Sequence, residues 1–200
     1  MAQARVLTER ELRKVLSYCS TQPHAARNRA ILLCAHLAGM RVGEVAALRI
    51  SNVLAADSTI LEAISLSARQ TKGDKARTTV LVASKLREEL KQYLQQRFGL
   101  TELIAVTYTD MERALFPTQK NPNRGFTANT LCQLFHKIYK DARMTGATSH
   151  SGRRTFITKL ADKGVGVRLL MAIAGHKSLN STLKYIELNP TVMKAAVELV

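Results

Sequence analysis

The sequence predicts a mainly α-helical domain with a small antiparallel β-sheet, which is an α+β fold. Apolar residues recur at helical spacing in most segments of the 200-residue chain, whereas the stretch between residues 60 and 82 follows the pattern of short strands. Glycine and proline separate these segments, as is typical of turns. With 46% hydrophobic and only 5% aromatic residues, the chain can bury a largely aliphatic core. Its length fits one domain, or at most two small ones.

Helices account for most of the predicted elements. Thr8 and Glu11 form a capping box at the start of the first helix, and Gly39 suits the end of the second. Apolar residues at helical spacing continue late in the chain, for example at Leu131 and Phe135. The predicted helices cover residues 8–20, 25–38, 42–48, 84 onward, 127–141, 151–163, 167–174 and 179–188.

A β-hairpin is predicted in the middle of the chain. Residues 60–64 and 78–82 have the composition of short strands, and the turn-rich basic segment 71–75 lies between them. We expect one domain over residues 1–190. The amphipathic tail 191–200 would then pack on a neighbouring protomer or fold back on its own core.

The chain is strongly basic. Its 30 lysines and arginines outnumber 15 aspartates and glutamates, which gives a formal net charge of +15. Such a surface attracts a polyphosphate and gains affinity by releasing its counterions. A generally basic surface that serves solubility is the alternative interpretation. The charge balance favours a nucleic acid as the partner.

The cysteines and the apolar runs indicate a cellular compartment. Cys19, Cys34 and Cys132 are far apart, lack metal-ligand spacing and lie in apolar helical patterns, so we expect buried free thiols. No run of about 18 apolar residues occurs, and charged residues interrupt the first 20 positions. We therefore expect a soluble, cytoplasmic protein with no membrane partner, which a nucleic-acid partner would make nucleoid-associated.

Four sites along the chain carry residues suited to phosphate chemistry. His150 and Arg153 project to the same side of a helix, where an arginine fork and a proton-sharing imidazole can hold one phosphodiester. Arg41 opens a helix, and Glu44 can orient its guanidinium. Taken alone, each of these sites is more often an ordinary surface or helix pair.

The other two of the four sites, at Lys72 and at His176 with Tyr185, are also uninformative in isolation. Lys72 lies in the predicted hairpin turn, where a basic tip can enter a DNA groove or where a lysine is simply solvated. Tyr185 follows His176 by nine positions, and a tyrosine between Leu183 and Ile186 is usually a core or rim aromatic.

Taken together, the order and spacing of these sites resemble the tyrosine recombinase, or phage integrase, family. AGMRVGE at 38–44 is similar to the family's first arginine box, TKGDKAR at 71–77 to its hairpin lysine, and HSGRRTF at 150–156 to its His-x-x-Arg box. GHKS at 175–178 and Tyr185 are similar to its closing histidine and its nucleophile. The resemblance spans about residues 7–190 and implies the tyrosine recombinase catalytic-domain fold.

The resemblance implies a site-specific DNA recombinase that breaks and rejoins strands. Tyr185 would attack a phosphodiester and form a phosphotyrosyl bond to the DNA 3′ end. Arg41 and Arg153 would neutralise the charge that grows on the non-bridging oxygens. A phenol keeps its proton at neutral pH, so His150 would assist its transfer.

The remaining residues complete the implied site. Lys72 would protonate the departing 5′ oxygen, and His176 would hydrogen-bond the phosphate or support its geometry. Glu44 would support Arg41. No carboxylate cluster suits a Mg²⁺ ion, so we expect no metal and no other cofactor. The predicted DNA contacts are Lys75, Arg77, Arg154 and Lys177.

The chain departs from the family pattern in three respects. Family members often carry leucine at the position of Gly152 and histidine at that of Arg154. Arg41 also occurs too early to leave room for the usual N-terminal DNA-clamping domain, so the chain resembles the short fimbrial-switch recombinases.

The family resemblance also implies the partners. These are double-stranded DNA, three further protomers in a tetramer on two DNA sites, and accessory DNA-bending proteins. Two alternatives remain at this point: relaxation of supercoiled DNA in the manner of a type IB topoisomerase, and a DNA-binding regulator whose catalytic residues are vestigial.

Overall fold

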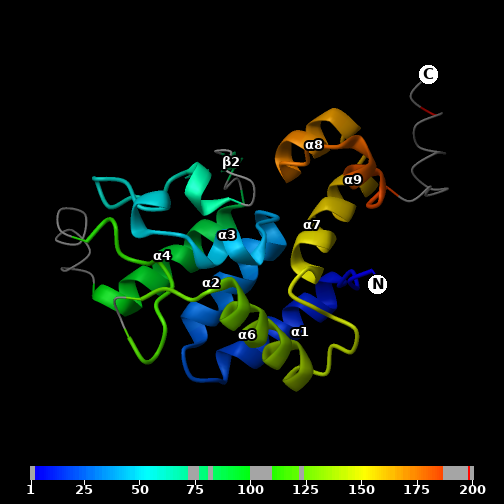
Figure 1. The fold of residues 1–200 in the computed structure, drawn as a ribbon. Helices are drawn as coiled ribbons and strands as arrows, with labels where there is room; N and C mark the ends of the chain where they lie inside the picture. The colour runs from blue at the N-terminus through cyan, green and yellow to red at the C-terminus, as the bar shows by residue number, and fades with distance from the viewer. Residues whose placement is uncertain are drawn as a thin grey trace.

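The computed structural model describes residues 3–71, 83–99, 110–121, 124–186 and 198, together with the backbone of residues 77–80. Within these residues the chain is mostly helical and has one two-stranded antiparallel sheet, so the predicted α+β class is confirmed (Figure 1). Among the same residues, no helix is both long and apolar enough to cross a membrane.

The helices follow the predicted order. They are α1 (Glu9–Ser20), α2 (Ala25–Leu37), α3 (Val42–Ala46), α4 (Ser84–Phe98), α6 (Ala128–Asp141), α7 (Ser151–Asp162), α8 (Val167–Ala174) and α9 (Leu179–Leu183). Two 3₁₀ turns, η1 (Ile50–Asn52) and η2 (Ala68–Gln70), flank β1. The predicted capping box starts α1, because the Thr8 hydroxyl accepts from the Glu11 amide at 3.2 Å and the Glu11 carboxylate accepts from the Thr8 amide at 2.9 Å.

Two helices are shorter than the sequence predicts. Helix α3 ends at Ala46 instead of residue 48, because the Leu48 amide bonds only three positions back, to the Val45 carbonyl, and the Leu48 carbonyl accepts from the Leu115 amide at 2.8 Å. Helix α9 ends at Leu183, so Tyr185 lies in the turn that follows the helix. The predicted tail 191–200 lies outside the described residues except for position 198.

The hairpin is confirmed, with a shift of its first strand. Strands β1 (Ala63–Leu66) and β2 (Arg77–Val80) pair antiparallel, with Ala63 opposite Val80 and Leu66 opposite Arg77. The strand predicted over 60–64 begins at residue 63, because Ile60 instead bridges Leu54 and closes a local turn. Residues 81 and 82 of the second predicted strand lie outside the described residues.

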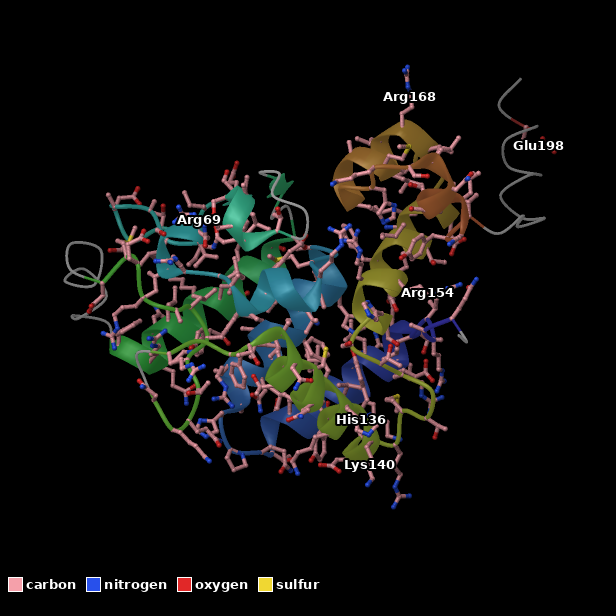
Figure 2. All side chains as sticks on the ribbon, viewed as in Figure 1. Arg69, His136, Lys140, Arg154, Arg168 and Glu198 are labelled. Atoms are coloured by element: carbon pink, nitrogen blue, oxygen red, sulfur yellow. The ribbon has the colours of Figure 1, made fainter. Side chains whose placement is uncertain are left out.

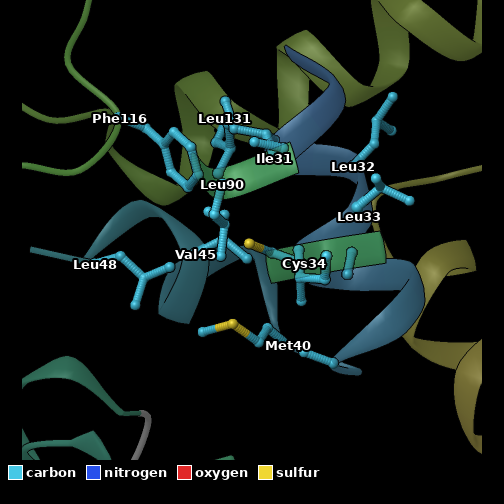
Figure 3. Close-up of a cluster of buried hydrophobic side chains, with 14 of the residues drawn as sticks. Ile31, Leu32, Leu33, Cys34, Met40, Val45, Leu48, Leu90, Phe116 and Leu131 are labelled. Atoms are coloured by element: carbon cyan, nitrogen blue, oxygen red, sulfur yellow. The ribbon is translucent and has the colours of Figure 1, made fainter. Parts of the chain in front are cut away.

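Helix α2 is the centre of the core. It packs against α1, α4 and α7, and its residues Ile31, Leu32, Leu33 and Cys34 are all fully buried (Figure 3). Every position from residue 30 to residue 36 is buried. A helical segment that is buried on all sides has consecutive apolar residues instead of a single apolar stripe.

The prediction of buried cysteines holds for two of the three. Cys19 and Cys34 are buried free thiols, and burial raises the pKa of the Cys34 thiol to about 12. Cys132 is only half-buried, because it faces the turn before α7, where its thiol lies 3.4 Å from the Ser149 hydroxyl.

A half-buried ion pair ties three helices together. The Arg29 guanidinium of α2 forms a bidentate contact with the Glu89 carboxylate of α4, its Nε donating at 2.9 Å. The same guanidinium donates to the Leu16 carbonyl and the Ser20 hydroxyl of α1 at 3.2 and 2.8 Å. Because Glu89 is almost fully buried, this pair fixes how α1 and α4 sit on α2.

The buried His36 makes stability depend on pH. Its Nε2 lies 2.9 Å from the Tyr139 hydroxyl, and burial, aided by the charge of Lys159, lowers its pKa from 6.5 to about 4. Between these values the unfolded chain binds a proton that the folded chain does not. Stability is therefore fully present above pH 6.5 and falls by about 3 kcal/mol as the pH drops to 4.

Urea unfolding between pH 7 and pH 4 measures this effect. We expect the fall in unfolding free energy to be much smaller in a His36→Gln variant, which keeps a polar partner for Tyr139 but does not titrate. Equal pH slopes in the two proteins would show that His36 is not buried in its neutral form.

Candidate active site

Five of the six predicted catalytic side chains line one cleft. The cleft has a volume of about 680 Å³, and the five residues are Arg41, His150, Arg153, His176 and Tyr185. They come from the starts of α3 and α7 and from the turns after α8 and α9. A larger cleft of about 790 Å³, between the α1–α2 turn and α6, contains none of these side chains. The sixth residue, Lys72, lies outside the described residues.

Arg41 is held by a buried carboxylate at the start of α3. Glu44 is 2% exposed, and its two oxygens accept from the Arg41 amide at 2.7 Å and from the Arg41 guanidinium at 2.8 Å. The guanidinium also donates to the Gly175 carbonyl at 3.3 Å. The predicted support of Arg41 by Glu44 therefore has a clear geometry, and a buried carboxylate fixes the arginine more firmly than a surface ion pair does.

Arg153 is the most buried of the five residues. It is 4% exposed, and its guanidinium donates to the Gly39 carbonyl at 2.6 Å and to the Ala174 carbonyl. Gly39 has a positive φ of 60°, a conformation that suits glycine, and this turns its carbonyl toward α7. Arg153 thus joins the end of α2 to the end of α8 at the base of the cleft.

The two histidines lie at different depths. His150 is the N-cap residue of α7 and is exposed, so it lies at the cleft mouth and not within the helix itself. His176 is half-buried, and its Nδ1 lies 2.9 Å from the hydroxyl of Thr182, which is fully buried. Thr182 therefore fixes the orientation of the His176 ring.

Tyr185 enters the cleft from the turn after α9. Its amide donates to the Thr182 carbonyl at 2.9 Å. Its ring stacks on that of His176, with ring centroids 5.5 Å apart and an interplanar angle of 22°. The phenol therefore lies in the same cleft as the two arginines of its own chain.

The structure describes the side chains of two of the four predicted DNA contacts, Lys177 and Arg154. Lys75 lies outside the described residues, and only the backbone of Arg77, in β2, is described. Lys177 is exposed in the turn after His176. Arg154 lines the cleft, with its guanidinium carbon 5.8 Å from the centroid of the Tyr185 ring.

Several residues that build the cleft were not predicted from the sequence. Thr182 and the carbonyls of Gly39 and Ala174 hold the predicted catalytic side chains His176 and Arg153 in place. Thr148 and Ser181 also line the cleft. A glycine at position 39, two residues before Arg41, is a weak signal that the backbone there has a special conformation. Nothing in the local sequence distinguishes Thr182 from other threonines.

Replacing Glu44 with glutamine is expected to lower the DNA cleavage that the family resemblance implies. The amide keeps the shape but loses the charge that holds Arg41, and a displaced catalytic group costs about a hundredfold in rate. We expect a loss of about tenfold to a hundredfold, measured as single-turnover cleavage at saturating protein. Glu62→Gln, which removes one partner of an exposed ion pair with Arg87, is the matched control. An unchanged rate for Glu44→Gln would mean that the Gly175 carbonyl alone positions Arg41.

The fold is that of tyrosine recombinase catalytic domains. The crystal structure of XerA recombinase superposes with a TM-score of 0.74 at 24% identity, over 100% of this chain and 66% of that one. The catalytic domain of bacteriophage HP1 integrase superposes with a TM-score of 0.61 at 18% identity, over 98% of this chain and 95% of that one.

The chain belongs to the phage integrase family, whose sequence model matches residues 5–191. Among curated proteins, tyrosine recombinase XerA of Pyrococcus furiosus is 28% identical over 96% of this chain and 60% of its own length. Tyrosine recombinase XerC of Oceanobacillus iheyensis is 29% identical over 88% of this chain and 54% of its own length. The chain therefore spans about 60% of the length of the XerA relative.

Proposed function

We propose that this chain is a site-specific DNA recombinase that cleaves and rejoins DNA through a 3′-phosphotyrosyl intermediate. The observation that carries the proposal is the cleft in which Tyr185 meets Arg41, His150, Arg153 and His176. Membership of the phage integrase family and similarity to XerA and XerC support the same reaction. The similarity to the short fimbrial-switch recombinases stays a prediction, because the curated relatives named above are Xer recombinases.

The chemistry begins at the phosphodiester. The Tyr185 oxygen attacks phosphorus, the bond from phosphorus to the 5′ oxygen breaks, and the DNA 3′ end remains joined to the enzyme. Negative charge on the non-bridging oxygens increases during the attack. Arg41 and Arg153 are held in place before the substrate arrives, so they stabilise this charge without a reorganisation cost.

Two proton transfers accompany the attack. His150, at the cleft mouth, accepts the phenol proton and returns it during rejoining. Lys72 donates a proton to the departing 5′ oxygen. His176 supports the geometry through its contact with the Tyr185 ring. The bond energy is kept in the phosphotyrosyl link, so the reaction needs neither a nucleotide cofactor nor a metal.

Double-stranded DNA is the proposed substrate. XerH recombinase, whose structure with its difH substrate superposes with a TM-score of 0.67 at 24% identity, supports this assignment. The net charge of +15 favours binding to the phosphate backbone. Lys75, Arg77 and Lys177 are the proposed backbone contacts, and Arg154 lies at the cleft.

Recombination needs more than one protomer. We propose a tetramer on two DNA sites, in which the apolar tail 191–200 packs on a neighbouring protomer, and accessory DNA-bending proteins act with it. A truncation after Pro190 is expected to weaken assembly on DNA while strand cleavage persists. The cytoplasmic, nucleoid-associated location predicted from the sequence fits this role.

A suicide-substrate assay tests the proposal. Purified protein is mixed with nicked duplexes taken from the neighbourhood of its gene, in parallel reactions with and without EDTA, next to a Tyr185→Phe variant. We expect a covalent protein–DNA adduct with the unchanged protein alone. DNA binding without an adduct on any duplex would contradict the proposal and favour a regulator. An adduct that EDTA abolishes would contradict the metal-independent mechanism.

A second assay separates recombination from topoisomerase activity. Supercoiled DNA that carries a single site is incubated with the protein, and a parallel reaction contains two sites. A recombinase gives exchanged products only with two sites. Relaxation with one site and no exchange with two would identify a type IB topoisomerase-like activity instead.

A further inference from the structure

The Tyr185 ring contacts two side chains whose roles differ. His176 stacks on it from the turn after α8, and Arg154 of α7 places its guanidinium carbon 5.8 Å from the ring centroid. A guanidinium at this distance is attracted to the electron-rich face of an aromatic ring. Arg154 thus has a partner inside the protein, although the sequence alone predicts it to be a DNA contact.

We propose that Arg154 is a positioning residue, which holds the Tyr185 ring in the cleft and sets the phenol against the phosphate. This inference rests on the proposed function, in which Tyr185 is the nucleophile.

Arg154 lies on α7 directly after Arg153, so one helix positions both arginines relative to the cleft. Successive side chains leave a helix about 100° apart, so Arg153 and Arg154 point in different directions. Arg153 reaches the Gly39 and Ala174 carbonyls at the base of the cleft, whereas Arg154 reaches the Tyr185 ring. One turn of α7 therefore carries both a predicted phosphate ligand and the cation beside the nucleophile.

Tyr185 needs such lateral support because of its place in the chain. It follows the five-residue helix α9 and lies in a turn, where the hydrogen bond that its amide donates to the Thr182 carbonyl holds the backbone but not the ring. The stack on His176 restrains the ring from the α8 side. The contact with Arg154 links the ring to α7, so the spacing between phenol and phosphate follows from one rigid helix.

Arginine at this position also departs from the histidine that is common in the family. A guanidinium is planar, always charged and reaches further than an imidazole. It can therefore reach the Tyr185 ring from α7 and stay charged there. Arg168, on α8, offers a comparison: it is exposed and points away from the rest of the domain (Figure 2).

The first experiment measures the contact itself in the DNA-free protein. The chain has five tyrosines, so protein made with fluorotyrosine gives five fluorine signals at most, and Tyr185→Phe identifies one of them. We expect Arg154→Gln to shift the Tyr185 signal, and Arg168→Gln to leave it in place. A Tyr185 signal that Arg154→Gln does not move would overturn the proposal.

The second experiment separates positioning from DNA binding. Single-turnover cleavage of a suicide substrate is measured over a range of protein concentrations. We expect Arg154→Gln to lower the rate at saturation by about 3- to 30-fold, the range that corresponds to one cation–π contact, with half-saturation changed less than twofold. Arg154→Lys keeps the cation and is expected to recover part of the rate. Arg168→Gln should match the unchanged protein.

The opposite result overturns the proposal. If Arg154→Gln raises the half-saturation concentration while the saturated rate stays unchanged, Arg154 is a DNA-backbone contact only. Thermal unfolding of each variant shows whether a lost rate comes from a lost fold, and Arg154→Lys tests the contact if the glutamine variant unfolds. A Tyr185→Phe protein that still forms an adduct would refute the proposed nucleophile, and the fluorine result would still report on the contact.

Discussion

Replacing Arg153 with lysine is expected to lower single-turnover DNA cleavage by about 10²- to 10³-fold, the loss typical of removing one preorganised donor from a developing anion. Lysine keeps the charge, but it lacks the planar fork that reaches the Gly39 and Ala174 carbonyls together. One of these buried carbonyls would lose its donor, so we also expect about 1–3 kcal/mol of lost stability.

The matched control is Arg168→Lys, the same exchange at an exposed position on α8. It should cleave at the rate of the unchanged protein. Cleavage is measured well below the unfolding temperature of each variant, so that the catalytic effect is separated from the loss of stability. An Arg153→Lys protein that cleaves within threefold of the unchanged rate would mean that only the charge matters at this position.

Replacing Gly152 with alanine is expected to destabilise the fold, although alanine is the better helix former by about 1 kcal/mol. A Cβ at position 152 would lie 2.8 Å from the Ala35 Cβ and 2.9 Å from the His36 ring, both on α2. Helix α7 would have to move away from α2, and overpacking of this kind costs about 1–3 kcal/mol. Gly152→Leu, the residue common in the family, should cost more.

Gly43→Ala is the control for this prediction. Gly43 is also helical, and a Cβ there would meet the Ala128 Cβ at 3.8 Å, which is an ordinary contact. We expect urea unfolding to show little change or a small gain for Gly43→Ala and a clear loss for Gly152→Ala. A gain at Gly152 would contradict the close packing of α7 on α2. Cleavage by Gly152→Ala should also fall, since the neighbouring Arg153 moves with α7.

Much of the fold could be predicted because its signals are local. The capping box at Thr8 and the apolar stripe of α6 depend on residues within a few turns, and both elements formed as predicted. The errors arise where tertiary contacts decide. Ile60 left its predicted strand to pair with Leu54. The close approach that Gly152 allows depends on α2, more than 100 positions away, so the sequence showed only an unusual glycine.

The cleft could be predicted only through its family pattern. Residues such as Arg41 and Tyr185 are 144 positions apart, and no periodicity in the chain indicates that they line the same cleft. The residues that hold them could not be predicted, because a backbone carbonyl such as that of Ala174 has no signature in the sequence. Arg154 illustrates this limit: its charge indicated DNA binding, whereas its contact with Tyr185 appears only in three dimensions.

Mass spectrometry of the trapped protein–DNA adduct tests the central claim most directly. The adduct formed on a nicked duplex is digested with protease and nuclease, and the modified peptide is sequenced. The account predicts a nucleotide joined through its 3′ phosphate to Tyr185. The flanking residues Lys184 and Ile186 identify the modified peptide. A nucleotide joined to any other residue, or joined through a 5′ phosphate, would contradict it.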